Sequence, residues 1–286
     1  MIEMGNVTLS GGWFKMGADD GPHREDGEGP IRNVWLNPFK ISKTAVSNKE
    51  FKEFIDATGY KTLAEEIGTS FVFFKFLKNP DHYAGSNLTQ IWRSVPNASW
   101  SSPEGANSNV LKRLDHPVVH ISRRDALAFC EWRNCRLLTE AEWEYVATGG
   151  ISRARFFGID RQKVCRFGNV YDYTAEEVLD YGLEVLPCND RHGFSAPIGS
   201  FEPNHFGLYD TLGNVWEWTE DCQAIMWRSA PTDASARVDG HCTHRAYRGG
   251  SWLSHPPKYL QIPDRYKYLE AREIDLGFRI ALTLYP

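Results

Sequence analysis

Residues 205–219 combine oxygen-bearing side chains with glycines in a pattern that suits a hard cation. The segment reads HFGLYDTLGNVWEWT and supplies oxygen atoms from Asp210 and Asn214. A segment without a helix or strand period also turns main-chain carbonyl oxygens towards one point, and calcium takes about six to eight oxygen ligands. The glycines allow tight turns, and the two tryptophans supply apolar area to pack against them. The pattern predicts either a calcium loop or a tight turn under tryptophans, and both readings stay open at this point.

Histidines and cysteines further along the chain suggest a different metal. The residues concerned are Cys222, His241, Cys242, His244 and His255. Imidazole and thiolate together suit copper, iron or zinc. The run His-Cys-Thr-His matches no standard zinc spacing, so solvated histidines with a buried or disulfide-bonded cysteine are the alternative to a transition-metal site.

Ser251 is a third candidate because it follows two glycines in RGGSW. Glycines before it permit close approach of a ligand to the backbone, although a serine and a tryptophan after two glycines also suit the start of a strand. Arg279, in GFR, is expected to be a structural arginine that donates to loop carbonyls. Cys130 is expected to pack on a helix face, whereas Cys135 lies in a turn, where partial exposure allows some reactivity.

The composition narrows the class of protein. The chain has 286 residues and a net charge of −5, with ten Trp, twelve Tyr, sixteen Phe and 24 Gly but only four Met. This composition favours an irregular fold whose loops are held by aromatic side chains. Neither nucleic acid nor a membrane surface is favoured as a partner, since acidic and basic residues are interspersed and no apolar run approaches about 18 residues. No linker or repeat divides the chain, so we expect one domain over residues 1–286.

The cysteines bear on the compartment. The six cysteines form no CxxC pair, and the first residues show no signal-peptide pattern. The cytoplasm is therefore the default expectation. A secreted or periplasmic location is the alternative if a signal peptide has been removed, and the even number of cysteines would then permit disulfides.

Three helices are predicted by their capping residues. Each begins after a Ser or Thr that is followed three residues later by an acid, and the three caps are Ser47, Ser122 and Thr139. Gly59 ends the first helix and the glycine pair at 149–150 ends the third.

The rest of the chain shows weaker signals. We expect a hairpin strand with a glycine bend at 8–17, a second strand at 31–39 with Val34, Leu36 and Phe39 facing inward, and a short helix at 174–181. Residues 60–120 show little regular pattern. A loop of that length in a compact domain is commonly functional.

Six motifs in the same order resemble the formylglycine-generating enzyme, or sulfatase-modifying factor, family. They are GWFKMG at 12–17, DHPV at 115–118, RLLTEAEWEY at 136–145, GLYDTLGNVWEWTED at 207–221, RGGSW at 248–252 and LGFRIA at 276–281. The resemblance runs from about residue 8 to 282. It implies an α+β fold with little regular secondary structure, a single-domain variant of the C-type lectin fold.

The resemblance also implies a chemistry and shows a departure from it. Active members oxidise a sulfatase cysteine to formylglycine with molecular oxygen and a copper ion held by two cysteines. Those cysteines lie three and eight residues after the serine of GGS, and the corresponding residues here are Ser254 and Tyr259. Soft sulfur selects Cu(I), which a hydroxyl and a phenol do not replace. The copper-binding pair is therefore absent, although copper or iron held in another way stays open.

Candidate site residues follow from the same resemblance. Ser251, Ser254 and His255 are the catalytic candidates, and Trp100 and Tyr259 are the candidates for substrate contact. The family's two calcium sites correspond to one set made of Asn169, Val170, Asp190 and His192 and a second made of Asp210, Thr211, Gly213 and Val215. Calcium is expected to hold irregular backbone in place there.

Two classes of function remain in view. One is a divergent oxidoreductase that acts on a peptide, a protein or a small biosynthetic intermediate. The other is a binding module on the lectin-like scaffold, or an inactive relative that binds a sulfatase. The sequence makes no prediction of the oligomeric state.

Overall fold

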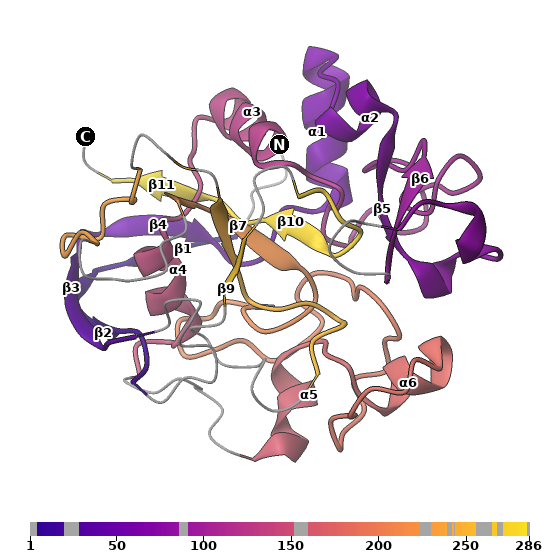
Figure 1. Cartoon of the computed structure of the whole chain (residues 1–286). Helices are drawn as coiled ribbons and strands as arrows, with labels where there is room; N and C mark the ends of the chain where they lie inside the picture. Colours follow the sequence, from indigo (N-terminus) through magenta and orange to yellow (C-terminus); the bar gives the residue numbers. More distant parts are fainter. Residues whose placement is uncertain are drawn as a thin grey trace.

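The computed structural model describes residues 5–19, 29–85, 91–151, 160–222, 230–238, 242, 244–255, 265–267 and 271–284. Short strands are arranged in four small sheets (Figure 1). One contains β1 (Asn6–Leu9), β4 (Phe39–Ser42) and β11 (Ala281–Thr283), in the order β1-β4-β11 and antiparallel throughout. The first and last strands of the described chain therefore flank the same central strand.

The largest sheet has four strands and contributes to the candidate site. Its order is β10-β7-β8-β9, from β7 (Trp216–Cys222), β8 (Arg245–Arg248), β9 (Arg265–Lys267) and β10 (Leu276–Phe278). β10 runs parallel to β7, whereas the other pairs are antiparallel. Two hairpins complete the strands: β2 (Gly12–Met16) pairs with β3 (Arg32–Leu36), and β5 (Thr69–Phe73) pairs with β6 (Trp92–Pro96).

Six α-helices surround these sheets. They are α1 (Asn48–Thr58), α2 (Leu63–Ile67), α3 (Arg123–Arg133), α4 (Glu140–Ala147), α5 (Val164–Phe167) and α6 (Tyr173–Leu179) among the described residues. Figure 1 places α1 and α2 beside the β5–β6 hairpin, and α5 and α6 on the opposite side of the molecule from α3. Among the residues that the structure describes, single 3₁₀ turns span Phe74–Phe76, Pro80–His82 and Arg161–Lys163.

The three predicted helix starts are confirmed as capping boxes. Ser47, Ser122 and Thr139 each accept a hydrogen bond from the backbone N–H three residues on, and the acid at that position accepts one from the cap's N–H. Gly59 ends α1 in the left-handed conformation, as predicted. These signals are local, which is why the sequence alone locates them.

The glycine bend predicted within 8–17 is confirmed, whereas the second strand needs correction. Gly11 turns the chain between β1 and β2 at φ +67°, and a Cβ there would lie 2.2 Å from the Leu36 carbonyl oxygen. The predicted strand at 31–39 is likewise divided between β3 and β4. Its inward residues, Val34, Leu36 and Phe39, are buried as predicted.

The region 60–120 is more regular than its sequence suggested. It contains α2, β5 and β6, each five residues long. Elements this short show too little periodicity to be recognised without their tertiary partners. The short helix predicted at 174–181 is α6, and its N-cap is Asp172 rather than Thr174.

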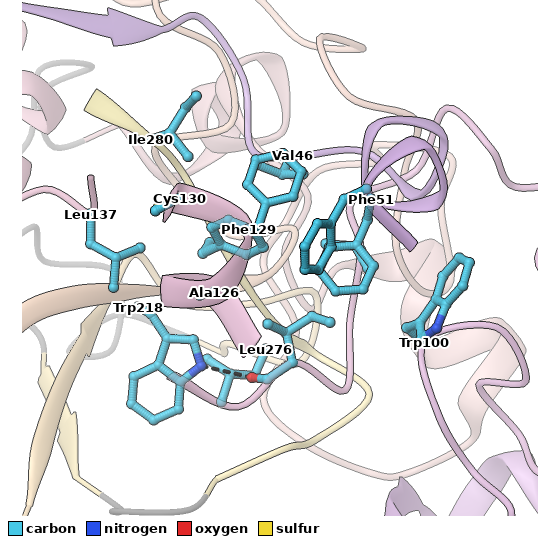
Figure 2. Close-up of a cluster of buried hydrophobic side chains, with 14 of the residues drawn as sticks. Val46, Phe51, Trp100, Ala126, Phe129, Cys130, Leu137, Trp218, Leu276 and Ile280 are labelled. Carbon is cyan, nitrogen blue, oxygen red and sulfur yellow. Dashed lines mark hydrogen bonds between the residues drawn. The ribbon is translucent and has the colours of Figure 1, made fainter. Parts of the chain in front are cut away.

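Aromatic side chains fill the main core cluster (Figure 2). Phe51 of α1 lies edge-on to Trp100, with ring centroids 5.5 Å apart, and stacks on Phe129 of α3 at 6.0 Å. Trp218 of β7 is fully buried and donates its indole N–H to the Ile121 carbonyl oxygen at 2.7 Å. Aromatic packing therefore joins α1, α3 and the four-stranded sheet, as the composition predicted.

Candidate functional site

A buried charge network connects three of the motifs identified in the sequence. Arg279, in GFR, donates to both carboxylate oxygens of Glu217 in VWEW and to three backbone carbonyls, those of Ser42, Lys43 and Tyr209. Glu217 also accepts the indole N–H of Trp143 at 2.8 Å. The prediction that Arg279 is a structural arginine is confirmed.

A second buried ion pair links the RGGSW strand to α4. Arg248 donates to Glu144 at 2.6 Å, and its guanidinium lies 3.6 Å from Glu140. The other oxygen of Glu144 accepts the backbone N–H of Gly17 at 2.5 Å. Buried charges are tolerated only when they are paired and hydrogen-bonded. The Arg248 ion pairs therefore hold in place the strand that leads to Ser251.

Ser251 begins a tight turn that follows β8. The Ser251 N–H donates to Ser254 Oγ at 2.9 Å, and the Ser254 N–H donates back to the Ser251 carbonyl at 2.9 Å. Gly250 precedes the turn at φ +76°, and a Cβ there would lie 2.8 Å from Ser254 Oγ. Both serines are buried, at 1% and 7% exposure. The glycine is therefore required by both the backbone conformation and the closeness of Ser254.

Two acidic residues precede β10, and one of them, Asp275, lies beside this turn. Burial raises the pKa of Asp275 to about 6, and the neighbouring Ser251 side chain opposes part of that rise. Removal from water raises the pKa of Glu273 to about 8, and the negative charge of Asp275 raises it further while Arg272 opposes the rise. Near neutral pH the two coupled carboxyl groups share a proton, and Asp275 is the one that faces Ser251.

The remaining catalytic and substrate candidates are distributed differently. His255 is half-buried directly after the turn, whereas Tyr259 lies outside the described residues. Trp100 is only 6% exposed and packs against Phe51 in the core. This burial corrects the expectation that Trp100 offers its ring to a substrate. The sequence reading missed Asp275 and Glu273, whose signal was two acids just before the LGFRIA motif.

The second predicted calcium set forms a turn with an unpartnered oxygen. Asp210 is 4% exposed; its Oδ2 accepts the Gly199 N–H at 2.8 Å, but its Oδ1 is buried without a hydrogen-bond partner among the described residues. Burial raises the pKa of Asp210 to about 6. Asp210, Gly213 and Asn214 all have positive φ, which curls the chain into a tight turn. An orphaned, buried carboxylate oxygen is the donor that a hard cation would satisfy.

The first predicted calcium set has the same feature. Asn169 is fully buried; its amide NH₂ donates to the Phe194 carbonyl at 2.8 Å, while its Oδ1 has no partner among the described residues. Asp190 accepts the backbone N–H groups of Val170 and His192 at 3.0 and 2.8 Å. The four predicted residues are thus linked in part by their own hydrogen bonds.

The two sets meet through the main chain. Asn169 forms a parallel bridge with Gly213, and the Asn214 N–H donates to the Asn169 carbonyl at 2.7 Å. A Cβ on Gly213 would lie 1.9 Å from that carbonyl oxygen. Two segments about 45 residues apart in sequence are therefore held in direct contact at this bridge.

Asp172 is a residue that the sequence reading missed. Its carboxylate caps α6 through the Ala175 N–H and also accepts the Asp190 N–H. Burial, together with the charge of Asp172, raises the pKa of Asp190 to about 7. Cys165 lies close to both acids, but its sulfur is bonded to Cys188. Two buried carboxylates side by side would be relieved by a cation.

The proposed transition-metal residues are brought together only in part. Cys242 is bonded to Cys222, so in this structure its sulfur is not a thiolate ligand. The side chain of His244 is exposed to solvent, whereas His241 lies outside the described residues. The structure thus corrects the metal reading of Cys242 in favour of the alternative, a disulfide.

Comparisons with known proteins agree with the arrangement of these motifs. The family model of the sulfatase-modifying factor enzyme 1-like domain matches residues 3–284. The chain belongs to this family. It is 39% identical to the formylglycine-generating enzyme of Thermomonospora curvata over 265 residues, covering 89% of this chain and 84% of that protein.

Two further relatives show how widely the family varies. The chain is 39% identical over 256 residues to the inactive C-alpha-formylglycine-generating enzyme 2 of Mus musculus, covering 86% of this chain and 74% of that protein. The solved structure of PvdO from Pseudomonas aeruginosa superposes with a TM-score of 0.73 and 28% identity, covering 98% of this chain and 94% of that one. The fold is thus that of the formylglycine-generating enzyme family, as the resemblance implied.

Proposed function

We propose that this chain is an oxidoreductase of the formylglycine-generating enzyme family whose site has diverged from two-thiolate copper chemistry. The observation that carries the proposal is the hydrogen-bonded pair of Ser251 and Ser254 beside Asp275. Ser254 stands where the resemblance expects a copper-binding cysteine. A hydroxyl and a carboxyl group are hard donors, and they bind Cu(I) poorly compared with sulfur.

The proposed chemistry relies on proton transfer at this turn. Asp275 and Glu273 have raised pKa values of about 6 and about 8, so one of the two holds a proton near neutral pH. A carboxyl poised near neutrality beside a hydroxyl suits the removal of a proton from a bound substrate. The substrate class that fits is a peptide, a protein segment or a small biosynthetic intermediate with an oxidisable group.

Calcium is the cofactor that the two oxygen-rich turns support. Asp210 and Asn169 each have a buried side-chain oxygen without a partner among the described residues. Asp190 would contribute its carboxylate to the Asn169 site, and backbone carbonyls of Val170, His192, Thr211, Gly213 and Val215 would complete the two shells. A bound ion there would neutralise buried charge and hold the turns that carry β7.

A redox metal at the serine turn would have to be held differently from the family's copper. Iron or copper on oxygen and histidine ligands, with His255 next to the turn, is the arrangement that the described residues allow. Such an ion would supply activation of oxygen, while the serines and carboxyl groups would orient the substrate and handle its proton.

A non-catalytic binding function is the second candidate. The mouse relative at 39% identity is named an inactive enzyme, which supports a role in binding a protein ligand such as a sulfatase. The lectin-like reading of the scaffold points in the same direction. This candidate predicts calcium but no redox metal in the purified protein.

Two observations bear on where the protein works. Cys165 pairs with Cys188 and Cys222 pairs with Cys242, and disulfides persist in oxidising compartments. They support the secreted or periplasmic alternative over the cytoplasmic default. None of the helices formed by the described residues has the length and apolar character needed to cross a bilayer.

Metal analysis with a designed control tests the proposed function. The protein, purified without added metal, is compared with the double variant Ser254→Cys/Tyr259→Cys, which restores the family's thiolate pair. We expect the variant, but not the wild type, to bind Cu(I) stoichiometrically and to convert a sulfatase-type cysteine peptide to its aldehyde. Near-stoichiometric iron or Cu(II) in the wild type, which oxygen and histidine ligands suit, supports the oxidoreductase, whereas calcium alone favours the binding function. Efficient conversion of the peptide by the wild type contradicts the proposed divergence.

A further inference from the structure

Two cysteines that the proposed function does not use lie on either side of the C-terminal end of α3. Asn134 ends the helix in the left-handed conformation at φ 53°. The Asn134 N–H donates to the Glu131 carbonyl at 3.2 Å, and the Cys135 N–H donates to the Cys130 carbonyl at 2.9 Å. This pair of bonds is the Schellman motif, in which the side chains of the first and last residues come into contact. The helix end therefore brings Cys130 and Cys135 together.

The two thiols interact with each other. Hydrogen bonding to Cys135 is the largest cause of the raised pKa of the Cys130 thiol, and burial adds to it. Neither sulfur takes part in a disulfide, in contrast to the four cysteines paired elsewhere in the chain. The pair thus consists of a buried thiol, Cys130, that is held in its protonated form, and a neighbouring thiol, Cys135, that is partly exposed.

A surface groove gives reagents access to the pair. The groove has a volume of about 960 Å³ and both cysteines line it. Cys130 is 3% exposed, whereas Cys135 is partly exposed. Arg136 also lines the groove and pairs with Glu142 at 2.6 Å, so a guanidinium stands next to the thiols.

The surroundings favour a redox role over a metal site. Among the described residues, the group of three metal-ligating side chains within reach of one another is Cys165, Asp172 and Asp190, and it does not include this pair. Zinc sites use about four ligands, usually with three or more from the protein. Two thiols without a third ligand suit disulfide formation better than zinc binding.

We propose that Cys130 and Cys135 form a reversible dithiol–disulfide couple that exchanges with small disulfides such as oxidised glutathione. The Cys135 thiolate attacks one sulfur of oxidised glutathione, forms a mixed disulfide and releases one glutathione thiolate. Cys130 then loses its proton, attacks the Cys135 sulfur and releases the second glutathione. Two protein thiols are oxidised and one glutathione disulfide is reduced to two thiols, so electrons and protons balance.

Disulfide formation here would act on the core. Figure 2 shows Cys130 on α3 close to Leu137 and Ile280, which belong to the same core cluster. Arg136, directly after Cys135, forms an antiparallel bridge with Ala281 of β11. A disulfide would therefore fasten the end of α3 to the segment 134–139, which leads to α4 and pairs with β11 through Arg136, and we expect the oxidised form to melt at a higher temperature than the reduced form.

Peptide mapping tests the proposal directly. The full chain is reduced, freed of reductant, treated with oxidised glutathione and alkylated before digestion with trypsin without reductant. Trypsin cuts after Arg124, Arg133 and Arg136, so the proposed bond would join peptide 125–133 to peptide 134–136. We expect this linked pair to be the main product, and the matched variant Cys135→Ser to lack it.

The variant Cys130→Ser distinguishes resolution from simple modification. In this variant Cys135 should accumulate as a mixed disulfide with glutathione, whereas in the wild type that adduct should be lost to the internal disulfide. Alkylation of both cysteines in the wild type after glutathione treatment overturns the proposal. So does a stable glutathione adduct on wild-type Cys135, or a bond from either residue to another cysteine. The wild-type map alone decides the outcome if the buried serine prevents folding.

Discussion

Replacing Asp210 with asparagine tests whether the buried carboxylate needs a cation. The variant keeps the shape of the side chain and removes its charge. Burial raises the pKa of Asp210 to about 6 in the folded protein, compared with an ordinary value of 3.8. That difference corresponds to about 3 kcal/mol between the charged and neutral forms. The charged form therefore costs the fold up to about 3 kcal/mol at pH 7 when no cation compensates it.

The sign of the pH dependence follows from the direction of this pKa. A carboxyl whose folded pKa lies above its unfolded pKa binds its proton more tightly in the folded protein. The contribution of Asp210 to the free energy of unfolding is therefore most favourable below pH 3.8 and falls as the pH rises through about 6. Asp190, Asp275 and Glu273 also have raised pKa values and add to the trend in the wild type. The difference between wild type and Asp210→Asn isolates the contribution of Asp210.

Urea unfolding with and without calcium is the assay. In EGTA, the wild type should lose about 1.3 kcal/mol more than the variant between pH 5 and pH 7, because about half of the total of roughly 3 kcal/mol is already lost at pH 5. At pH 7, calcium at about a hundred times its dissociation constant should stabilise the wild type by about 3 kcal/mol. Asp210→Asn should lose the part of this calcium stabilisation that comes from the Asp210 turn and keep the part that comes from the Asn169 turn.

A surface variant provides the control, and two results would refute the reasoning. Asp56 pairs with Lys52 at 2.6 Å and its side chain is 61% exposed, so Asp56→Asn should change stability by less than about 1 kcal/mol and leave the calcium response intact. Equal wild-type stability in EGTA and in calcium would show that no cation site exists. A full calcium response in Asp210→Asn would show that the ion binds elsewhere.

Three further predictions concern the scaffold around the site. Glu217→Ala leaves the buried Arg279 without its carboxylate and should lower the free energy of unfolding in urea by about 3–5 kcal/mol. The control Glu202→Ala removes a carboxylate from an ion pair whose side chains are about half exposed, and should cost less than about 1 kcal/mol. Similar losses in the two variants would contradict the argument from burial. Gly250→Ala forces a Cβ into a position at φ +76° and against Ser254 Oγ, so it should destabilise by at least about 1–2 kcal/mol, and an unchanged midpoint would show that the turn adapts. Thr139→Ala removes the acceptor for the Glu142 N–H at 3.1 Å and should lower the free energy of unfolding by about 1 kcal/mol. The control Thr174→Ala changes a residue that is not the N-cap of α6 and should have a smaller effect. A larger loss in Thr174→Ala than in Thr139→Ala would contradict the assigned caps.

Local features were readable from the sequence because their interactions span few residues. The capping boxes at Ser47, Ser122 and Thr139 involve atoms three residues apart, and the left-handed end at Gly59 depends on one residue. The buried faces of β3 and β4 follow from strand alternation. Two short strands and α2 within residues 60–120 were missed because elements of five residues gain their stability from partners distant in sequence.

The candidate site was only partly readable for the same reason. The resemblance of motifs indicated Ser251, Ser254 and the calcium residues, but it did not indicate Asp275 beside Ser251 or Asp172 beside Asp190. It also placed Trp100 near a substrate, whereas the structure packs that ring against Phe51. Side chains at the two ends of long loops meet only when the whole chain has folded.

The sequence by itself determined the family, the helix caps, the aromatic character of the core and the loss of the cysteine pair. Each of these depends on residue type or on neighbours within one turn of chain. Only the tertiary structure decided which charges are buried together, such as Glu217 with Arg279 at a separation of 62 residues, and which cysteines meet. Such contacts depend on the path of irregular loops, and a path without a repeating period leaves no pattern in the sequence.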